Sequence, residues 1–288
     1  MTTSFGQYEL KLGDNDGQNI WGGQKLQESG DHVTRLQKAL KAAGIPLGQA
    51  DGAFGTATQR AVKMFQWCAT SHPYRINNQS VIMDTQSPQV PTSGCLSSQT
   101  AQELTRWLGQ KYMATGDLVR ISLNDLAHIE LGAGFRRLAH PSIRETDLVI
   151  SAGAKDLILV ANRLAGQHSV KLVLNQSVRV AGQHVSGAVV TPATRSQHLI
   201  GHAIDCNIVD GSRWNNSADF LNRRQSAAAD AFISNMKAAG FRWGGEFSNP
   251  DTPHFDKQVA PHSETYNYKY YFNQRSISNP LPIPLKAV

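Results

Sequence analysis

The spacing of apolar residues changes along this chain of 288 residues, and the change predicts two folded units of different kinds. In the first 110 residues, apolar side chains recur three or four positions apart, as on the buried face of a helix. The segments with this spacing are DHVTRLQKALKAAG from Asp31, GTATQRAVKMFQ from Gly55 and SSQTAQELTRWL from Ser97. We therefore expect a domain of three helices over residues 1–110.

A polar stretch from Ser71 to Ser93 interrupts this pattern. It is rich in Pro, Asn, Gln and Ser and has no sustained apolar periodicity. Such a composition is typical of loops, so we expect a surface loop inserted between the second and third helices.

The second part of the chain mixes the helical and the strand-like patterns. Residues 111–146 are expected to be a linker or lead-in, and a domain is expected over 147–288. DLVISAGAKDLILVANRLAG and SADFLNRRQSAAADAFISNMKAAG each predict one helix, the second ending at Gly240. VKLVLNQSVRV, AIDCNIVD, RWGGEF and HFDKQV predict strands. The predicted fold class is α+β, with a mainly antiparallel sheet beside the helices.

Composition narrows the possible partners. Hydrophobic residues make up 40% and charged residues 17%, which indicates a soluble globular protein. A net charge of +6 favours encounter with polyanions, but no basic stretch laced with aromatic residues stands out, so we expect no nucleic acid partner. No apolar run has the length of a signal peptide core or a membrane span. We expect a monomer made in the bacterial cytoplasm, without membrane insertion.

Three residues have the side chains and the arrangement of a metal site. His198 precedes a turn at Gly201, a predicted strand then carries Asp205, and His254 lies far downstream. A catalytic zinc ion takes three imidazole or carboxylate ligands and leaves a fourth position for the water that becomes the nucleophile. Three cysteines without CxxC spacing argue against a cysteine zinc site or a disulfide framework.

The first domain resembles the three-helix peptidoglycan-binding domain of many wall hydrolases. The resemblance runs from about Tyr8 to Gln110 and implies bacterial peptidoglycan as the partner. The matching positions are Leu36, Gln37, Leu40, Asp51, Gly52, Phe54, Gly55, Thr58, Ala61, Val62, Phe65 and Gln66. The chain departs from the family in the insertion after Trp67 and in Ser93-Gly94, where the family has a second Asp-Gly.

The second domain resembles the zinc D-alanyl-D-alanine and L-alanyl-D-glutamate peptidases, which include many phage endolysins. The pattern SxHxxGxAxD begins at Ser196, and DxPHF begins at Asp251. The resemblance implies one zinc ion per chain, held by His198, Asp205 and His254, with Asp251 as the general acid/base. It covers roughly residues 147–260, and WGGEFSNPDTPHF is particularly similar to the L-alanyl-D-glutamate endolysins.

Two departures from that family leave roles open. Glu246 and Phe247 stand where the family often has Asp and Trp, so Glu246 is a rival for the base. The family's arginine, usually in a Gly-Tyr-Arg-Ser setting, has Arg179 as its counterpart, a candidate contact for a substrate carboxylate or an oxyanion.

Three further residues are candidates for substrate binding: Ser196, His202 and Trp243. No GxSxG elbow surrounds Ser196, so we expect it to support a ligand by a hydrogen bond and not to act as a nucleophile. His202 is expected to flank the site or to face the substrate.

The expected function is zinc-dependent hydrolysis of peptide bonds in peptidoglycan. The simplest form is a phage endolysin released through a holin into the periplasm or wall. A secretion-system toxin with the same chemistry is one alternative, and a wall-binding protein without catalysis is another. The bond could be L-alanyl to D-glutamate, the D-alanyl cross-link or the terminal D-alanine.

Overall fold

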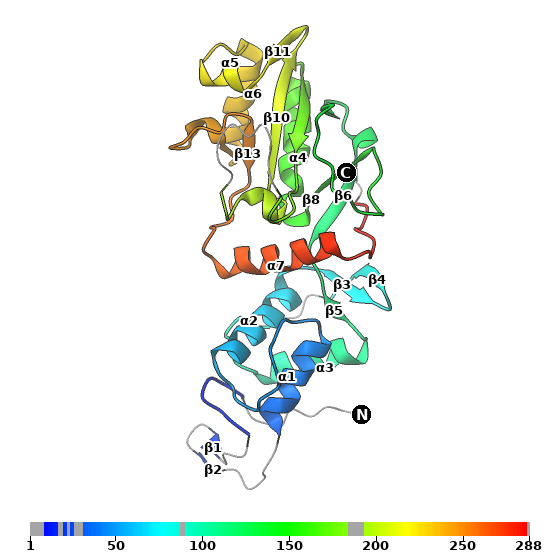
Figure 1. Cartoon of the computed structure of the whole chain (residues 1–288), viewed down its shortest axis with the longest axis vertical. Helices are drawn as coiled ribbons and strands as arrows, with labels where there is room; N and C mark the ends of the chain where they lie inside the picture. Colours follow the sequence, from blue (N-terminus) through cyan, green and yellow to red (C-terminus); the bar gives the residue numbers. More distant parts are fainter. Residues whose placement is uncertain are drawn as a thin grey trace. The chain divides into compact units, whose positions relative to one another are not determined.

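The computed structural model describes residues 9–16, 20–21, 24–25, 31–86, 90–183 and 193–286 (Figure 1). Tyr8, where the family resemblance begins, lies outside the described residues. The chain divides into two compact units, Met1–Thr115 and Gly116–Val288. Each unit is described below by itself.

Where the structure describes the first unit, it contains three helices, as the apolar spacing predicts. They are α1 (His32–Ala42), α2 (Thr56–Ser71) and α3 (Ser98–Gly109). Leu36, Phe65 and Trp107 are buried between them, and the rings of Phe65 and Trp107 meet edge to face at 5.1 Å. The α1 helix ends before Gly44, whose φ of +77° is readily adopted by glycine.

The insertion between α2 and α3 is a β-hairpin, so the expectation of a loop was wrong. Its strands β3 (Tyr74–Asn77) and β4 (Ser80–Met83) pair antiparallel, and β5 (Met113–Ala114) pairs with β3. The two turn residues, Asn78 and Gln79, both have positive φ, as the tightest hairpin turns require. A largely polar composition and the absence of glycine from the turn hid this hairpin from sequence analysis. A two-stranded pair, β1 (Ile20–Trp21) and β2 (Gln24–Lys25), also belongs to this unit.

The second unit is built on one mixed sheet in the order β12-β13-β10-β9-β7, with β11 paired to the far end of β10. The strands are β7 (Ile129–Leu131), β9 (Val170–Gln176), β10 (Ala203–Asp210), β11 (Arg213–Asn215), β12 (Arg242–Trp243) and β13 (His254–Asp256). Among the described strands of this sheet only β7 and β9 run parallel, so the prediction of an α+β fold with a mainly antiparallel sheet is confirmed.

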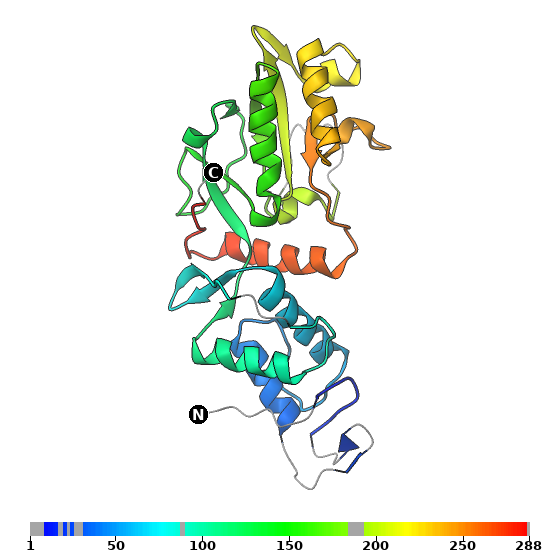
Figure 2. The ribbon, with the colours of Figure 1, turned by 180° about the vertical axis from the view of Figure 1, so that it is seen from behind.

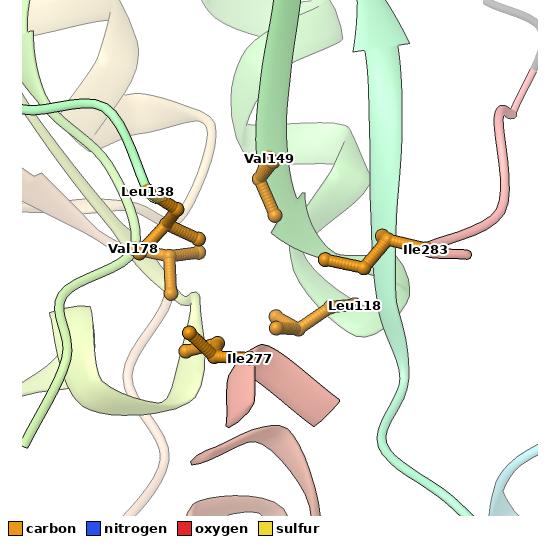
Figure 3. Close-up of a cluster of buried hydrophobic side chains, with 6 residues drawn as sticks. All are labelled: Leu118, Leu138, Val149, Val178, Ile277 and Ile283. Carbon is orange, nitrogen blue, oxygen red and sulfur yellow. The ribbon is translucent and has the colours of Figure 1, made fainter. Parts of the chain in front are cut away.

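The described part of this unit contains four α-helices, and Figure 2 shows α4 and α6 side by side against the sheet. The helices are α4 (Lys155–Gln167), α5 (Ser217–Leu221), α6 (Ala227–Ala238) and α7 (Glu264–Ser278). A separate ribbon pairs β6 (Leu118–Ser122) with β8 (Asp147–Ser151). Side chains from this ribbon, from α7 and the segment after it, and from the segments that follow β7 and β9 form one apolar cluster (Figure 3): Leu118, Leu138, Val149, Val178, Ile277 and Ile283.

Three further expectations need correction. Residues 111–146, expected to be a linker or lead-in, instead supply β5 to the first unit and β6 and β7 to the second. Residues 147–151 form a strand in place of the start of a helix, because a short run buried on both sides has no periodicity that separates the two structures. The helix predicted to end at Gly240 is two helices, since the chain turns at Arg223, which has a φ of +54°, and restarts with Ser226 as a new N-cap.

Within the described residues, no helix combines the length and the apolar character that crossing a bilayer requires.

Candidate metal centre and active site

Two neighbouring strands and one short turn bring three candidate ligands together. Asp205 on β10 and His254 on β13 are direct partners across the antiparallel pair, so their side chains leave the sheet side by side. His198 lies on the 3-10 helix η3 (Gln197–Ile200), just before β10. Gly201 ends that helix with a φ of +72°, and a side chain there would come within 2.8 Å of a backbone nitrogen. The turn therefore needs glycine to return His198 over the strand.

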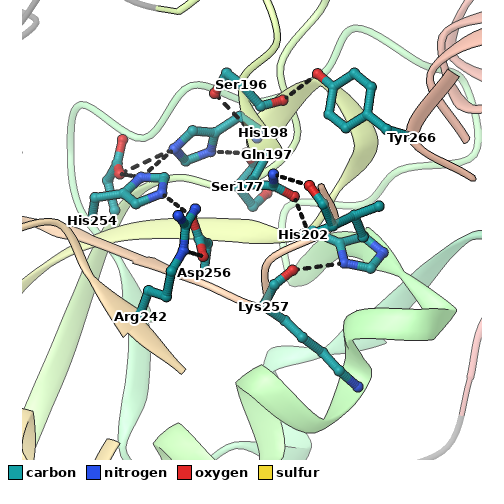
Figure 4. A network of polar contacts seen from close by, with 12 residues as sticks. Ser177, Ser196, Gln197, His198, His202, Arg242, His254, Asp256, Lys257 and Tyr266 are labelled. Atoms are coloured by element: carbon teal, nitrogen blue, oxygen red, sulfur yellow. Dashed lines mark hydrogen bonds and ion pairs between the residues drawn. The ribbon is translucent and has the colours of Figure 1, made fainter. Parts of the chain in front are cut away.

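The three ligand atoms form a nearly equilateral triangle (Figure 4). Nε2 of His198, Oδ1 of Asp205 and Nδ1 of His254 are each 3.1 Å from the other two. Tetrahedral zinc with bonds of about 2.0–2.1 Å separates its ligand atoms by roughly 3.3 Å. The triangle therefore has the size of one face of a zinc tetrahedron.

The remaining hydrogen bonds fix which imidazole nitrogen carries the proton. Nδ1 of His198 lies 2.6 Å from the carbonyl oxygen of Ser177, which can only accept, so Nδ1 donates. Nε2 of His254 lies 3.0 Å from the carboxylate of Asp256 and donates to it. In the neutral rings, the nitrogens inside the triangle therefore present lone pairs. Two lone pairs and a carboxylate oxygen converge on one point, an arrangement that a cation stabilises.

The pKa shifts of Asp205 and His254 also indicate that this point favours a positive charge. Burial alone would raise the pKa of Asp205, but the charges and hydrogen bonds of His198 and His254 hold it well below its usual range. Burial likewise opposes protonation of His254, yet hydrogen bonds to Asp205 and Asp256 raise its pKa to about 10. Both shifts indicate that positive charge is favoured between these side chains. The donor set and its spacing thus fit a zinc ion.

Asp251 borders the three ligands. Its backbone carbonyl accepts from the amide of His254 at 3.0 Å, and its own amide donates to Gly244 at 2.9 Å. Burial and the charge of Asp205 raise the pKa of its carboxyl. Within the described part of the chain, that carboxyl makes no hydrogen bond or ion pair, so it is available to exchange a proton. Gly244 permits this close turn, because a side chain there would overlap the carbonyl of Asp251.

Arg179 lies at the same site. Its backbone amide donates to the carbonyl of His198 at 3.0 Å, and the residue is only 7% exposed. Burial lowers the pKa of the guanidinium, while the charge of Asp205 acts in the opposite direction. Among the described residues the guanidinium has no hydrogen-bonding or ion-pair partner, which leaves its donors available to a ligand.

Glu246 is not brought to the site. Its side chain is 55% exposed and pairs with the Lys237 ammonium group on α6. This placement argues against Glu246 as the rival base.

The other predicted residues have supporting positions. The Ser196 hydroxyl accepts from the backbone amide of His198 at 3.3 Å and so caps η3, in accordance with a supporting role. The indole of Trp243 donates to the carbonyl of Thr252 at 2.8 Å and braces the loop that carries Asp251. His202 is buried and bonds the carbonyl of Lys257 at 3.0 Å (Figure 4). It does not join the ligand triangle, because it lies just before β10 and its Nδ1 is turned to the carbonyl of Lys257.

Sequence analysis missed a carboxylate and an arginine behind the ligands. Arg242 on β12 donates to both oxygens of Asp256, at 2.8 and 2.6 Å, and Asp256 holds His254 (Figure 4). The signal was present, since residues two apart on a strand face the same way. Phe247 was also missed: its ring lies 5.7 Å from that of His254 and forms a wall of the site.

The α+β domain thus places a His-Asp-His group that could hold a metal ion beside the carboxyl group of Asp251. Residues 190–257 match the family described as D-alanyl-D-alanine carboxypeptidase, and residues 29–68 match the family described as putative peptidoglycan binding domain. The chain therefore carries an N-terminal peptidoglycan-binding domain and a C-terminal peptidase domain of the M15 type, which confirms the family resemblance. Together the two domains support peptidoglycan hydrolysis.

A comparison with solved structures found the crystal structure of the Serratia marcescens L-Ala D-Glu endopeptidase ChiX. It is 22% identical, covers 48% of this chain and 96% of its own, and superposes with a TM-score of 0.29. No curated protein matches the sequence of the chain.

Proposed function

We propose that the protein is a zinc-dependent peptidase that hydrolyses peptide bonds of bacterial peptidoglycan. The observation that carries this proposal is the triangle of His198, Asp205 and His254, whose 3.1 Å edges and converging lone pairs suit one zinc ion. A zinc ion held there supplies Lewis-acid chemistry, which polarises a carbonyl group and lowers the pKa of water.

The protein's own groups perform the proton transfers. Asp251 accepts a proton from the attacking water and then gives it to the nitrogen of the leaving amine. Burial and Asp205 raise its pKa, which suits a carboxyl group that must take up a proton and return it. Phe247 lies beside His254 and adds an apolar surface next to this exchange.

Arg179 is proposed to bind the substrate. Its guanidinium is largely buried near Asp205 and Asp251. Its N–H donors are not engaged by described residues, so they could bind an anionic group of the substrate. This group would hold either a carboxylate of the stem peptide or the oxyanion that develops on the scissile carbonyl.

We further propose that the protein acts as a lytic enzyme of the phage endolysin kind. The order of a wall-binding domain followed by a peptidase domain supports this role: the first unit concentrates the enzyme on its insoluble substrate, and the second cuts it.

Metal analysis and a chelator test the proposal directly. We expect about one zinc ion per chain, loss of activity on purified wall sacculi with a strong chelator, and recovery on adding zinc. His254→Ala should lose both the metal and the activity. Activity that resists the chelator would contradict the proposal.

A further inference from the structure

One end of the second unit exposes two short segments side by side, residues 211–214 and 221–224, which we name the arginine tip. They lie where β10 turns into β11 and where α5 ends (Figure 1). All eight residues are exposed: Gly211, Ser212, Arg213, Trp214, Leu221, Asn222, Arg223 and Arg224. Trp214 is 49% exposed and Leu221 57%. Two large apolar side chains and three arginines thus share one small surface.

The tip is held in a fixed shape. The guanidinium of Arg213 donates to the backbone carbonyl of Arg224, which ties the two segments together. Below them the Asn215 side chain, which is fully buried, donates to the carbonyl of Ile208 at 2.9 Å and accepts from the amide of Ser226 at 2.7 Å. The exposed groups therefore stand on a rigid base.

Arg223 occupies a position that disfavours its side chain. It follows the last turn of α5 with a φ of +54°, in the left-handed conformation that glycine usually adopts after a helix. A non-glycine residue is disfavoured in that conformation. The fold of this turn therefore does not account for the arginine, which instead adds a positive charge to the exposed surface.

The arginine tip carries only positive charges. None of its eight residues is acidic. Among the carboxylates near the tip, Asp219 is bonded to the amide of Asn216 in the N-terminal cap of α5, Asp230 accepts from the side chain of Gln225, and Asp210 lies opposite Arg213 across the hairpin. Arg213, Arg223 and Arg224 are all exposed, and among the described residues none of the three forms an ion pair with a carboxylate.

We propose that the arginine tip docks the protein on the surface of a bilayer that contains anionic phospholipids. Arginines bind lipid phosphates, and tryptophan is favoured at the depth of the headgroups because its ring is apolar and its N–H polar. Leu221 adds apolar area that a bilayer can cover and a hydrophilic phosphate polymer cannot. This contact is peripheral, and it does not depend on the proposed peptidase activity.

Vesicle sedimentation of the full chain tests the proposal. The protein should sediment with vesicles of equal parts phosphatidylcholine and phosphatidylglycerol, and not with phosphatidylcholine alone. Each arginine near an anionic membrane contributes roughly 1 kcal/mol, so the double variant Arg223→Gly, Arg224→Gln should bind about 30-fold more weakly. Arg223→Gly also relieves the left-handed turn, so the variant should fold.

A matched control removes the same charge elsewhere. Lys38→Gln with Arg163→Gln changes two exposed cations on α1 and α4 and should bind nearly as the wild type does. In vesicles of brominated phosphatidylcholine and phosphatidylglycerol, tryptophan fluorescence should be quenched, and Trp214→Phe should lose most of that quenching.

Three results would overturn the proposal: no sedimentation of the full chain with anionic vesicles, equal losses in the tip variant and the control, or unchanged quenching in Trp214→Phe. If the tip variant instead lost binding to purified sacculi and not to vesicles, the surface would serve an anionic wall polymer, and the assignment to lipid would be wrong.

Discussion

Nε2 of His254 lies 3.0 Å from Oδ2 of Asp256, two residues further along the same strand. Asp256 is 1% exposed and receives two hydrogen bonds from Arg242, so its position is fixed. The pair holds the ring of His254 with Nδ1 towards Asp205 and His198. A residue that contacts no metal thereby decides which nitrogen of His254 can bind one.

We therefore expect Asp256→Ala to weaken zinc binding about 10–100-fold, as the loss of such supporting carboxylates does. Asp256→Asn keeps an acceptor for His254 and should recover part of the affinity. Competition with a chelating dye measures the zinc affinity. Asp210→Ala, at the other end of the sheet, is the matched control. Equal affinities of Asp256→Ala and this control would show that Asp256 does not orient His254.

Asp251→Asn should lower turnover by about 10²–10⁴-fold, because it removes the group that exchanges the proton. Zinc content and melting temperature should stay near those of the wild type. Glu246→Gln should retain activity, since Glu246 is exposed and paired with Lys237. Steady-state assays on a soluble muropeptide compare the two variants. An inactive Glu246→Gln beside an active, zinc-loaded Asp251→Asn would assign the base to the other carboxyl.

The buried His202 should make the second unit sensitive to acid. Burial lowers the pKa of His202 from 6.5 to about 4, with Lys269 adding to the effect and Asp117 opposing it. At a pH between these two pKa values, His202 is more often protonated in the unfolded chain than in the folded one. The contribution of His202 to stability is therefore complete above pH 6.5 and is lost as the pH falls towards 4.

At pH 5 that loss amounts to about 2 kcal/mol. Calorimetry of the full chain without metal, at pH 8 and pH 5, measures it as a fall in melting temperature. His202→Gln cannot be protonated and should show a smaller fall. Identical falls in the two proteins would mean that His202 does not titrate in this range.

The hairpin turn of the first unit offers a test of stability. Gln79 has a φ of +65° in a turn where glycine is the usual residue. Gln79→Gly should stabilise the first unit by about 1 kcal/mol, because it removes that strain. Ser80→Gly, one residue later on β4, is the control and should destabilise it. A lower melting temperature for Gln79→Gly would contradict the expectation.

The sequence predicts those parts of the fold where periodicity is strong. The helices α1, α2 and α3 and the strand β10 follow directly from apolar spacing. The hairpin at β3 and β4 was missed because its turn uses Asn78 and Gln79 in place of glycine. The strand β8 was read as a helix because burial on both sides removes the alternation that identifies a strand.

The candidate site also has a part that the sequence predicts and a part that depends on how the chain folds. The convergence of His198, Asp205 and His254 was expected from the spacing, and the structure places the three together. Their role as zinc ligands remains a prediction. The position of Glu246 depends on how the chain turns after β12, and the proximity of Arg242 to Asp256 depends on strand pairing, so neither could be predicted from local sequence.

Mass spectrometry of the muropeptides released from purified sacculi tests the central claim most directly. The zinc-loaded wild type should release fragments that differ from the substrate by hydrolysis of one kind of peptide bond, whose identity the fragment masses give. Chelated protein and Asp251→Asn should release none above background. Fragments cut in the glycan, or peptide fragments that form equally with the chelated protein, would contradict a zinc peptidase built on His198, Asp205 and His254.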